Sequence, residues 1–233
     1  MTFVMPAEWA HHERVWIGFP SHLDAWEDAA LLAGAQRQIA AFANAVHDQG
    51  RGETVHLIAG SAEAAAVARG LVDDGLLVEQ RLIGDVWLRD TGCIIVRDGT
   101  DRIARNFGFN GWGNKFHYAG DQSIGRELAE ALGLEIVDSD WVLEGGSIDV
   151  DGEGNAVTTV DCLLNPNRNP GLGRAEIETK LMEELGIARL LWLGDGLTND
   201  HTDGHVDNLA RFVAPGHLVI PKAGDDDDPN AAI

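Results

Sequence analysis

The order of apolar and polar positions along the chain predicts helices and strands in regular alternation. Apolar residues recur every three or four positions over residues 24–50, which predicts a helix that ends at Gly50. Ser61 is the expected N-cap of a second helix. The other expected elements are strands at 53–59 and 76–80, the second of them buried, and helices at 61–70, 120–133 and 173–186. Such an alternation indicates the α/β class.

Three segments repeat the same succession of a strand, a polar corner rich in glycine and acids, and a hairpin. The corners are DVWLRDTG (85–92), WVLEGG (141–146) and NDHTDGHVD (199–207). The hairpin turns that follow them lie at 98–99, 151–154 and 215–216. Helical stretches separate the repeats, which is typical of propellers and stacked arrays. In a radial arrangement the three corners would converge on one axis.

Composition narrows the class of protein. The 233 residues are 45% hydrophobic and contain no apolar run of membrane-spanning length. The first residues show no apolar core behind a basic flank, so we expect no secretory signal and no membrane partner. Cys93 and Cys162 are too few for a disulfide framework, which favours a cytoplasmic protein. At this length we expect a single domain over residues 1–233.

The charge balance is strongly acidic, with 38 acidic residues against 17 lysines and arginines and a net charge of −21. Such a surface repels nucleic acid and anionic lipid, and it concentrates small cations. A solvated surface that promotes solubility explains the same composition. The charge is therefore compatible with a small cationic substrate but does not by itself select one.

The third corner has the highest density of candidate functional side chains, namely Asp200, His201, Asp203, His205 and Asp207. Histidine and aspartate are common metal ligands, but this spacing encloses a glycine and differs from the helical HExxH arrangement. No further ligand cluster stands out in the sequence. The alternative is a planar cation such as a guanidinium group, whose N–H donors match carboxylates in pairs. Acids from the three corners would bind it and leave a histidine as general acid and base.

Six motifs follow one another along nearly the whole chain: MPAEW (5–9), DVWLRDTG (85–92), FNGWGNK (109–115), LEGGSIDVDGEG (143–154), CLLNPNRNP (162–170) and TDGHVDN (202–208). Together they resemble the agmatine deiminase and bacterial-type peptidylarginine deiminase family of the pentein superfamily. The resemblance implies an α/β-propeller of five ββαβ-like units around a pseudo-fivefold axis. It also implies hydrolysis of a guanidine, in which a cysteine attacks the guanidine carbon, ammonia leaves and water releases a ureido product. Family members use no metal ion and no organic cofactor.

The resemblance gives roles to five residues of this sequence. Asp90 and Asp207 resemble the carboxylates that hold the guanidinium nitrogens. Glu144 resembles the acid beside the catalytic histidine, and His205 resembles the proton shuttle that also activates water. Trp87 resembles an aromatic wall of the pocket, although packing in the core would explain it equally well. We therefore expect four catalytic residues and three substrate-binding residues, two of them shared, and no metal site.

The sequence departs from the family pattern at its cysteines. Cys93 stands where the family usually has proline and opens an expected strand, where a small buried thiol is the ordinary interpretation. Cys162 falls in a motif whose cysteine is not the family's nucleophile, and by chain order it lies away from every corner. The family's catalytic cysteine belongs to a GGxNIHC-like segment, which this sequence does not contain. We therefore expect an incomplete propeller whose domain lacks its C-terminal part. The four aspartates at 225–228 are expected in a solvated loop.

Agmatine is the guanidine that fits best, because it presents only cations, whereas free arginine also requires a partner for its α-carboxylate. The expected reaction converts agmatine to N-carbamoylputrescine and ammonia, in the route to putrescine. Three alternatives stay open: a truncated or degenerate pentein that binds guanidines without catalysis, a deiminase of free or peptidyl arginine, and a metal-dependent hydrolase. A homo-oligomer is compatible with each of them. Given the expected positions of Cys93 and Cys162, residues 1–233 alone should not turn over agmatine.

Overall fold

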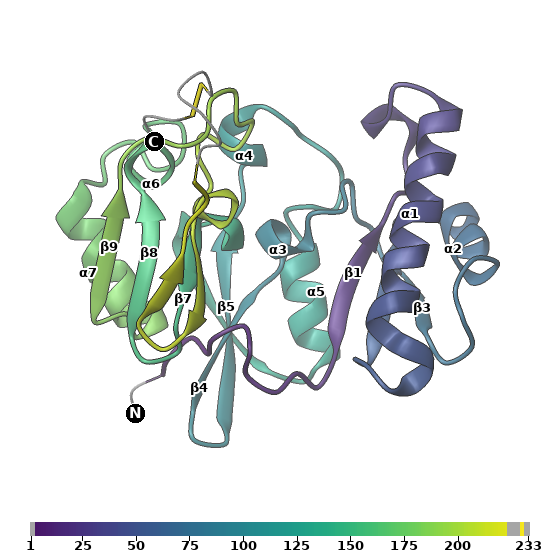
Figure 1. Ribbon diagram of the computed structural model, residues 1–233, viewed down its shortest axis with the longest axis horizontal. Helices are drawn as coiled ribbons and strands as arrows, with labels where there is room; N and C mark the ends of the chain where they lie inside the picture. Colours follow the sequence, from purple (N-terminus) through teal and green to yellow (C-terminus); the bar gives the residue numbers. More distant parts are fainter. Residues whose placement is uncertain (1–2, 223–228, 231–233) are drawn as a thin grey trace. The chain divides into compact units, whose positions relative to one another are not determined.

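The computed structural model describes residues 3–222 and 229–230, and its contacts divide the chain into two compact units. The parallel-sheet unit comprises residues 11–91 and 117–124. The hairpin unit comprises residues 1–10, 92–116 and 125–233. Helices and strands alternate in both, which confirms the predicted α/β class (Figure 1). The aspartate run at 225–228 lies outside the described residues.

The parallel-sheet unit is built from three parallel strands connected by two helices. Its strands are β1 (Val15–Phe19), β2 (Val55–Ala59) and β3 (Leu77–Gln80), paired in this order. The connections are α1 (Ala29–His47) and α2 (Ala62–Arg69), and short helical turns lie at Leu23–Ala25 (η1), Asp48–Gly50 (η2) and Leu88–Thr91 (α3). β2 is buried along its whole length, and alanines from both helices pack against it.

Local chemistry explains where the elements of this unit begin. The Asp28 carboxylate accepts hydrogen bonds from the backbone N–H groups of Ala30 and Leu31, so α1 begins after Asp28 and not at residue 24 as predicted. Ser61 caps α2 as predicted. The expectation that the strand at 76–80 is buried is wrong for β3. It is the edge strand of its sheet, and Leu77 is 51% exposed.

The hairpin unit repeats one motif, a hairpin followed by a helix and a strand parallel to the second hairpin strand. The first sheet contains β4 (Ile94–Asp98), β5 (Asp101–Gly108) and β6 (Glu135–Val142). The second contains β7 (Ile148–Val150), β8 (Asn155–Thr159) and β9 (Arg189–Leu193). A third hairpin consists of β10 (Arg211–Ala214) and β11 (His217–Val219). The helices are α4 (Gly111–Asn114), α5 (Ile124–Ala131), α6 (Val160–Leu163) and α7 (Arg174–Leu185), with short turns η3 (Gly145–Ser147) and η4 (Val206–Asn208).

One hydrophobic core joins the two three-stranded sheets of this unit. The buried face of α7 contributes Ile177, Leu181 and Leu185 to the same cluster as residues of β4, β5, β7 and β8. α7 ends at Gly186, whose φ of 71° is left-handed, and a Cβ there would lie 2.3 Å from the Phe3 carbonyl oxygen. Only glycine therefore fits at this helix end.

The structure confirms the predicted repeat. All three hairpins form, and each polar corner lies between a third strand and the next hairpin. The two complete repeats of the hairpin unit have the order strand, strand, helix, strand, which is the ββαβ order that the family resemblance implies. Cys93 lies one residue before β4 and not within it.

Candidate active site

Four of the sequence motifs lie at strand ends that share sheet edges in the hairpin unit. β5 and β6 are parallel, so residues 109–115 and 143–147 leave the first sheet at the same edge. β8 and β9 are also parallel, so residues 160–170 and 194–208 leave the second sheet at a common edge. Side chains then join the segments: Asn110 Nδ2 donates to the Asn167 carbonyl and Lys115 Nζ to the His201 carbonyl, both at 2.8 Å.

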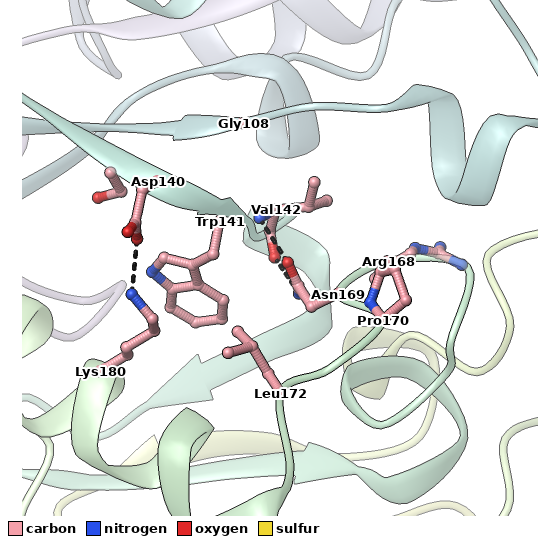
Figure 2. A pocket seen from close by; sticks show the side chains of 10 residues that line it. Gly108, Asp140, Trp141, Val142, Arg168, Asn169, Pro170, Leu172 and Lys180 are labelled. Atoms are coloured by element: carbon pink, nitrogen blue, oxygen red, sulfur yellow. Dashed lines mark hydrogen bonds and ion pairs between the residues drawn. The ribbon is translucent and has the colours of Figure 1, made fainter.

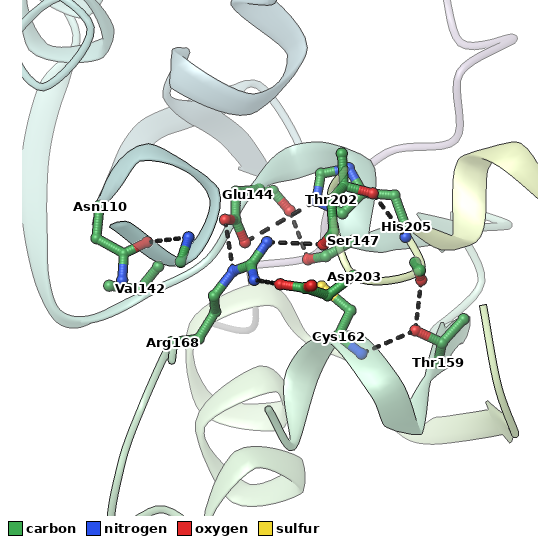
Figure 3. Close-up of polar contacts among 12 residues, drawn as sticks. Asn110, Val142, Glu144, Ser147, Thr159, Cys162, Arg168, Thr202, Asp203 and His205 are labelled. Atoms are coloured by element: carbon green, nitrogen blue, oxygen red, sulfur yellow. Dashed lines mark hydrogen bonds and ion pairs between the residues drawn. The ribbon is translucent and has the colours of Figure 1, made fainter. Parts of the chain in front are cut away.

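Glu144 and His205 lie next to each other within this cluster, and the catalytic roles that the family resemblance gives them stay predictions. Glu144 directly precedes η3, and His205 directly precedes η4. The His205 Nε2 atom lies 4.0 Å from Glu144 Oε2, and the two side chains are 2% and 0% exposed. This separation is too long for a hydrogen bond but allows an ion pair when His205 is protonated. Figure 3 shows the two side chains converging from separate loops.

Arg168 fixes the geometry of both corners, and its role was not predicted from the sequence. Its Nε donates to Glu144 Oε1 at 2.9 Å and its Nη2 donates to the Thr202 carbonyl at 2.7 Å, while Nη1 pairs with Asp203 (Figure 3). The side chain is fully buried. Burial opposes its charge, but Glu144, Cys162 and Asp203 outweigh this and raise the pKa of the guanidinium. The available signal was its position in the CLLNPNRNP motif, as the one cation among amides and prolines.

Cys162 also lies in this cluster, so the expectation that it is remote from every corner is wrong. One donor atom each of Glu144, Cys162 and His205 lies within 4.8 Å of the others, and all three residues are buried. The reason is topological. Cys162 follows β8, which runs parallel to β9, and therefore emerges at the sheet edge where the third corner begins. Thr159 Oγ1 secures this proximity by donating to the Gly204 carbonyl at 2.5 Å.

Several acids of the third corner shape the loop. Asp200 accepts hydrogen bonds from both the backbone N–H and the hydroxyl of Thr202. Burial acts to raise the pKa of Asp200, but these bonds outweigh it and lower the pKa. Asp203 has its pKa lowered in the same way, against burial, by Asn167, Lys115 and Arg168. Asp207 is half-buried in η4, two residues after His205.

The first corner belongs to the parallel-sheet unit. Asp90 is buried in α3, and Trp87 is 58% exposed just before it, which excludes the core-packing interpretation of Trp87. The corner is held by Asp121, whose Oδ1 accepts hydrogen bonds from the backbone N–H groups of Gly84 and Asp85. Burial raises the pKa of both Asp85 and Asp121. The predicted contacts of Asp90 and Trp87 with substrate stay predictions.

A surface cleft of about 550 Å³ also opens on the hairpin unit (Figure 2). Asp140 and Lys180 form an ion pair at its rim, and the Asn169 amide bonds to both the N–H and the carbonyl of Val142. Glu144 and His205 do not line it. The cleft is therefore separate from the catalytic candidates, although Arg168 borders both.

Comparison with known proteins decides the family. The family model for Porphyromonas-type peptidyl-arginine deiminases matches residues 4–233. The chain belongs to this family. Within the described part of this deiminase-family chain, no helix has both the length and the apolar character of a membrane span.

The relatives of this deiminase-family chain include several agmatine deiminases. Those of Pseudomonas aeruginosa (strain LESB58) and Stutzerimonas stutzeri (strain A1501) are each 42% identical to it, over 98% and 99% of the chain. A solved agmatine deiminase of Enterococcus faecalis is 31% identical over 97% of the chain, with a TM-score of 0.89. The chain spans 62–63% of the length of these relatives. The structural likeness confirms the predicted pentein fold, whereas closure around a pseudo-fivefold axis stays a prediction.

Proposed function

We propose that this chain forms the guanidine-binding and proton-transfer part of an agmatine deiminase. The reaction converts agmatine and water to N-carbamoylputrescine and ammonia, in the route to putrescine. The buried Glu144–His205 pair, held by Arg168, is the observation that carries the proposal. Relatives that bear the name agmatine deiminase support the choice of substrate. A cytoplasmic location and a homo-oligomeric state belong to the same proposal.

The proposed mechanism uses residues from all three corners. Asp90 and Asp207 pair with the guanidinium N–H groups, and Trp87 flanks the planar group. A cysteine thiolate adds to the guanidine carbon, and His205 gives its proton to the departing ammonia. His205 then takes a proton from water as the water attacks the thiouronium carbon, and the ureido product leaves. Glu144 lies beside the imidazolium that donates the proton in the first step and that the second step restores.

The cysteine nucleophile in this proposal comes from outside residues 1–233. Burial raises the pKa of the Cys93 thiol to about 11, which keeps it protonated near neutral pH. Cys162 has no exposed surface and lies on α6, within the buried cluster that also contains Glu144 and His205. Residues 1–233 should therefore form no ureido product from agmatine. Sustained product formation that is lost in Cys162→Ser would place the nucleophile at Cys162.

Substrate choice is tested by binding to the chain of residues 1–233. Calorimetric titrations compare agmatine with arginine and with an N-acylated arginine amide, in the presence of a chelator that removes metal ions. The proposal predicts that agmatine binds more tightly than both, because agmatine alone joins the guanidinium to a second cation without a carboxylate, which suits the acidic corners. Tighter binding of arginine or of the amide would reassign the substrate. Binding of none of the three would contradict the guanidine site.

A further inference from the structure

Three side chains of different chemistry form a compact cluster in the hairpin unit. The carboxylate of Glu144, the thiol of Cys162 and the imidazole of His205 each place one donor atom within 4.8 Å of the other two. They come from three separate segments: the second corner, α6 and the third corner. All three are at most 2% exposed. Figure 3 labels the three side chains. The strands that lead to them therefore preposition the cluster.

The Glu144 carboxylate is oriented toward the centre of this cluster. Arg168 Nε donates to Oε1, whereas Oε2 faces His205 and accepts no hydrogen bond from the described residues. A buried carboxylate oxygen without a donor is costly, and a bound cation removes that cost. Carboxylates that bind metals are commonly held from behind by a hydrogen bond, which is the place that Arg168 occupies.

The combination of donors selects the kind of cation. Mg²⁺ and Ca²⁺ prefer ligands that are all oxygen, whereas a thiolate, an imidazole and one carboxylate suit Zn²⁺. Ligand bonds of zinc are about 2.0–2.3 Å long, so tetrahedral ligands lie roughly 3.5 Å apart. The donor atoms lie within 4.8 Å of one another, so a bound ion would draw them together by up to about 1.3 Å.

We propose that Glu144, Cys162 and His205 bind one Zn²⁺ ion, with water as the fourth ligand. As the zinc–sulfur bond forms, the thiol S–H bond breaks and its proton passes to solvent, with no change of oxidation state. The bound ion coordinates the His205 nitrogen and the Glu144 oxygen, which are then not free to act in deimination. Zinc and a guanidine substrate then exclude each other. This exclusion rests on the proposed function, but zinc binding itself does not.

The test is a Co²⁺ titration of the reduced chain of residues 1–233, because cobalt reports sulfur ligation by a near-ultraviolet charge-transfer band. We expect one ion per chain, the sulfur band, release of at least one proton, and displacement of cobalt by zinc. Cys162→Ser should abolish the band and weaken zinc binding by more than the about 10–100-fold that loss of an outer partner costs. Cys93→Ser is the matched control and should keep both.

Two further measurements separate this site from adventitious binding. Exposed histidines such as His11 and His12 can hold a metal ion without any sulfur band. Circular dichroism establishes that each variant is folded, and His205→Asn gives a second test that leaves both cysteines intact. Cobalt binding by the folded wild-type chain without a sulfur band would overturn the proposal, as would a band that survives in both Cys162→Ser and His205→Asn. If agmatine fails to compete with bound zinc, the mutual exclusion is wrong.

Discussion

At the scale of single residues, Arg168 connects two corners that lie far apart in the sequence, through Glu144 and the Thr202 carbonyl. The sequence predicted that Glu144 and His205 act together, and they lie 4.0 Å apart. It did not predict the guanidinium that holds Glu144, nor the presence of Cys162 beside it. Both follow β8 in the chain, and their distance from the corners in sequence concealed their proximity in space. Contacts between distant segments depend on strand direction, which residue patterns alone do not give.

Replacement of Arg168 should be among the most destabilising changes in the hairpin unit. Arg168→Met leaves Glu144 as a buried carboxylate without its partner, so we expect a loss of about 3–5 kcal/mol in the free energy of unfolding. Arg168→Lys should lose less because it keeps the charge. Urea denaturation measures both. Arg51→Met is the control, since the Arg51–Asp48 pair is exposed and should contribute little. Equal losses in the free energy of unfolding for the Arg168 and Arg51 replacements would show that Arg168 does not stabilise the buried Glu144 carboxylate.

Cys93 should react slowly with alkylating reagents in the native chain. Burial raises the pKa of its thiol from 9.0 to about 11, so the reactive thiolate is about 100-fold scarcer near pH 8. Alkylation by iodoacetamide, followed by mass spectrometry of the Cys93 peptide, should be slower in the native state than in urea by at least about that factor. Similar rates in the two states would make Cys93 a reactive thiol and a candidate nucleophile.

At the scale of elements, the sequence predicted the order of helices and strands well, but it did not predict which strand lies at the edge of a sheet. Ser61 marked the start of α2 correctly because capping is local chemistry, whereas α1 ends at His47 and not at the predicted Gly50. The three glycine-containing turns gave the three hairpins for the same reason. The exposure of β3 was not predictable, because whether an apolar strand is central or at an edge depends on its partners. Capping and turn residues therefore determine where helices and hairpins form, whereas the pairing of strands determines which strands are buried.

Asp151 should stabilise the contact between the second and third hairpins. It accepts hydrogen bonds from the backbone N–H groups of Glu153, Asn155 and Gly216. Burial acts to raise its pKa, but these bonds and the Asn155 side chain lower the pKa below the ordinary 3.8. A lowered pKa means that the stabilisation is present above pH 3.8 and is lost as the pH falls through the folded-state value.

The variant Asp151→Asn should therefore lower the free energy of unfolding by about 1.5–3 kcal/mol at pH 7, the value of hydrogen bonds to a charged group. The difference from the unmutated chain should disappear as the pH falls below 3.8. Urea denaturation at a series of pH values measures it. Asp138→Asn is the control, because Asp138 is exposed and its pair with Arg126 is screened by water. If the difference in the free energy of unfolding between Asp151→Asn and the unmutated chain does not change with pH, the Asp151 side chain stabilises the contact through its shape and not through its charge.

At the scale of the whole molecule, composition limited the classes of ligand, whereas the motifs predicted the family. The net charge of −21 agrees with a cationic ligand, but it did not distinguish a substrate site from a solubilising surface. The six motifs predicted the family that the comparisons confirm. The single domain over residues 1–233 and the joint action of Asp90 with the Glu144–His205 pair stay predictions. They depend on long-range geometry that no local pattern encodes.

The central claim is that the chain holds a guanidinium group beside His205. The most direct test follows the imidazole signals of the ¹⁵N-labelled chain during titration with agmatine, with a chelator present. His205→Asn identifies the signal among the 9 histidines. Putrescine is the control ligand, because it lacks the guanidinium group, and Asp207→Asn tests the carboxylate that is proposed to bind this group. We predict that agmatine shifts the His205 signal, that putrescine does not, and that Asp207→Asn weakens the response at least about 10-fold. A His205 signal that agmatine leaves unmoved, or that putrescine moves equally, would contradict the account.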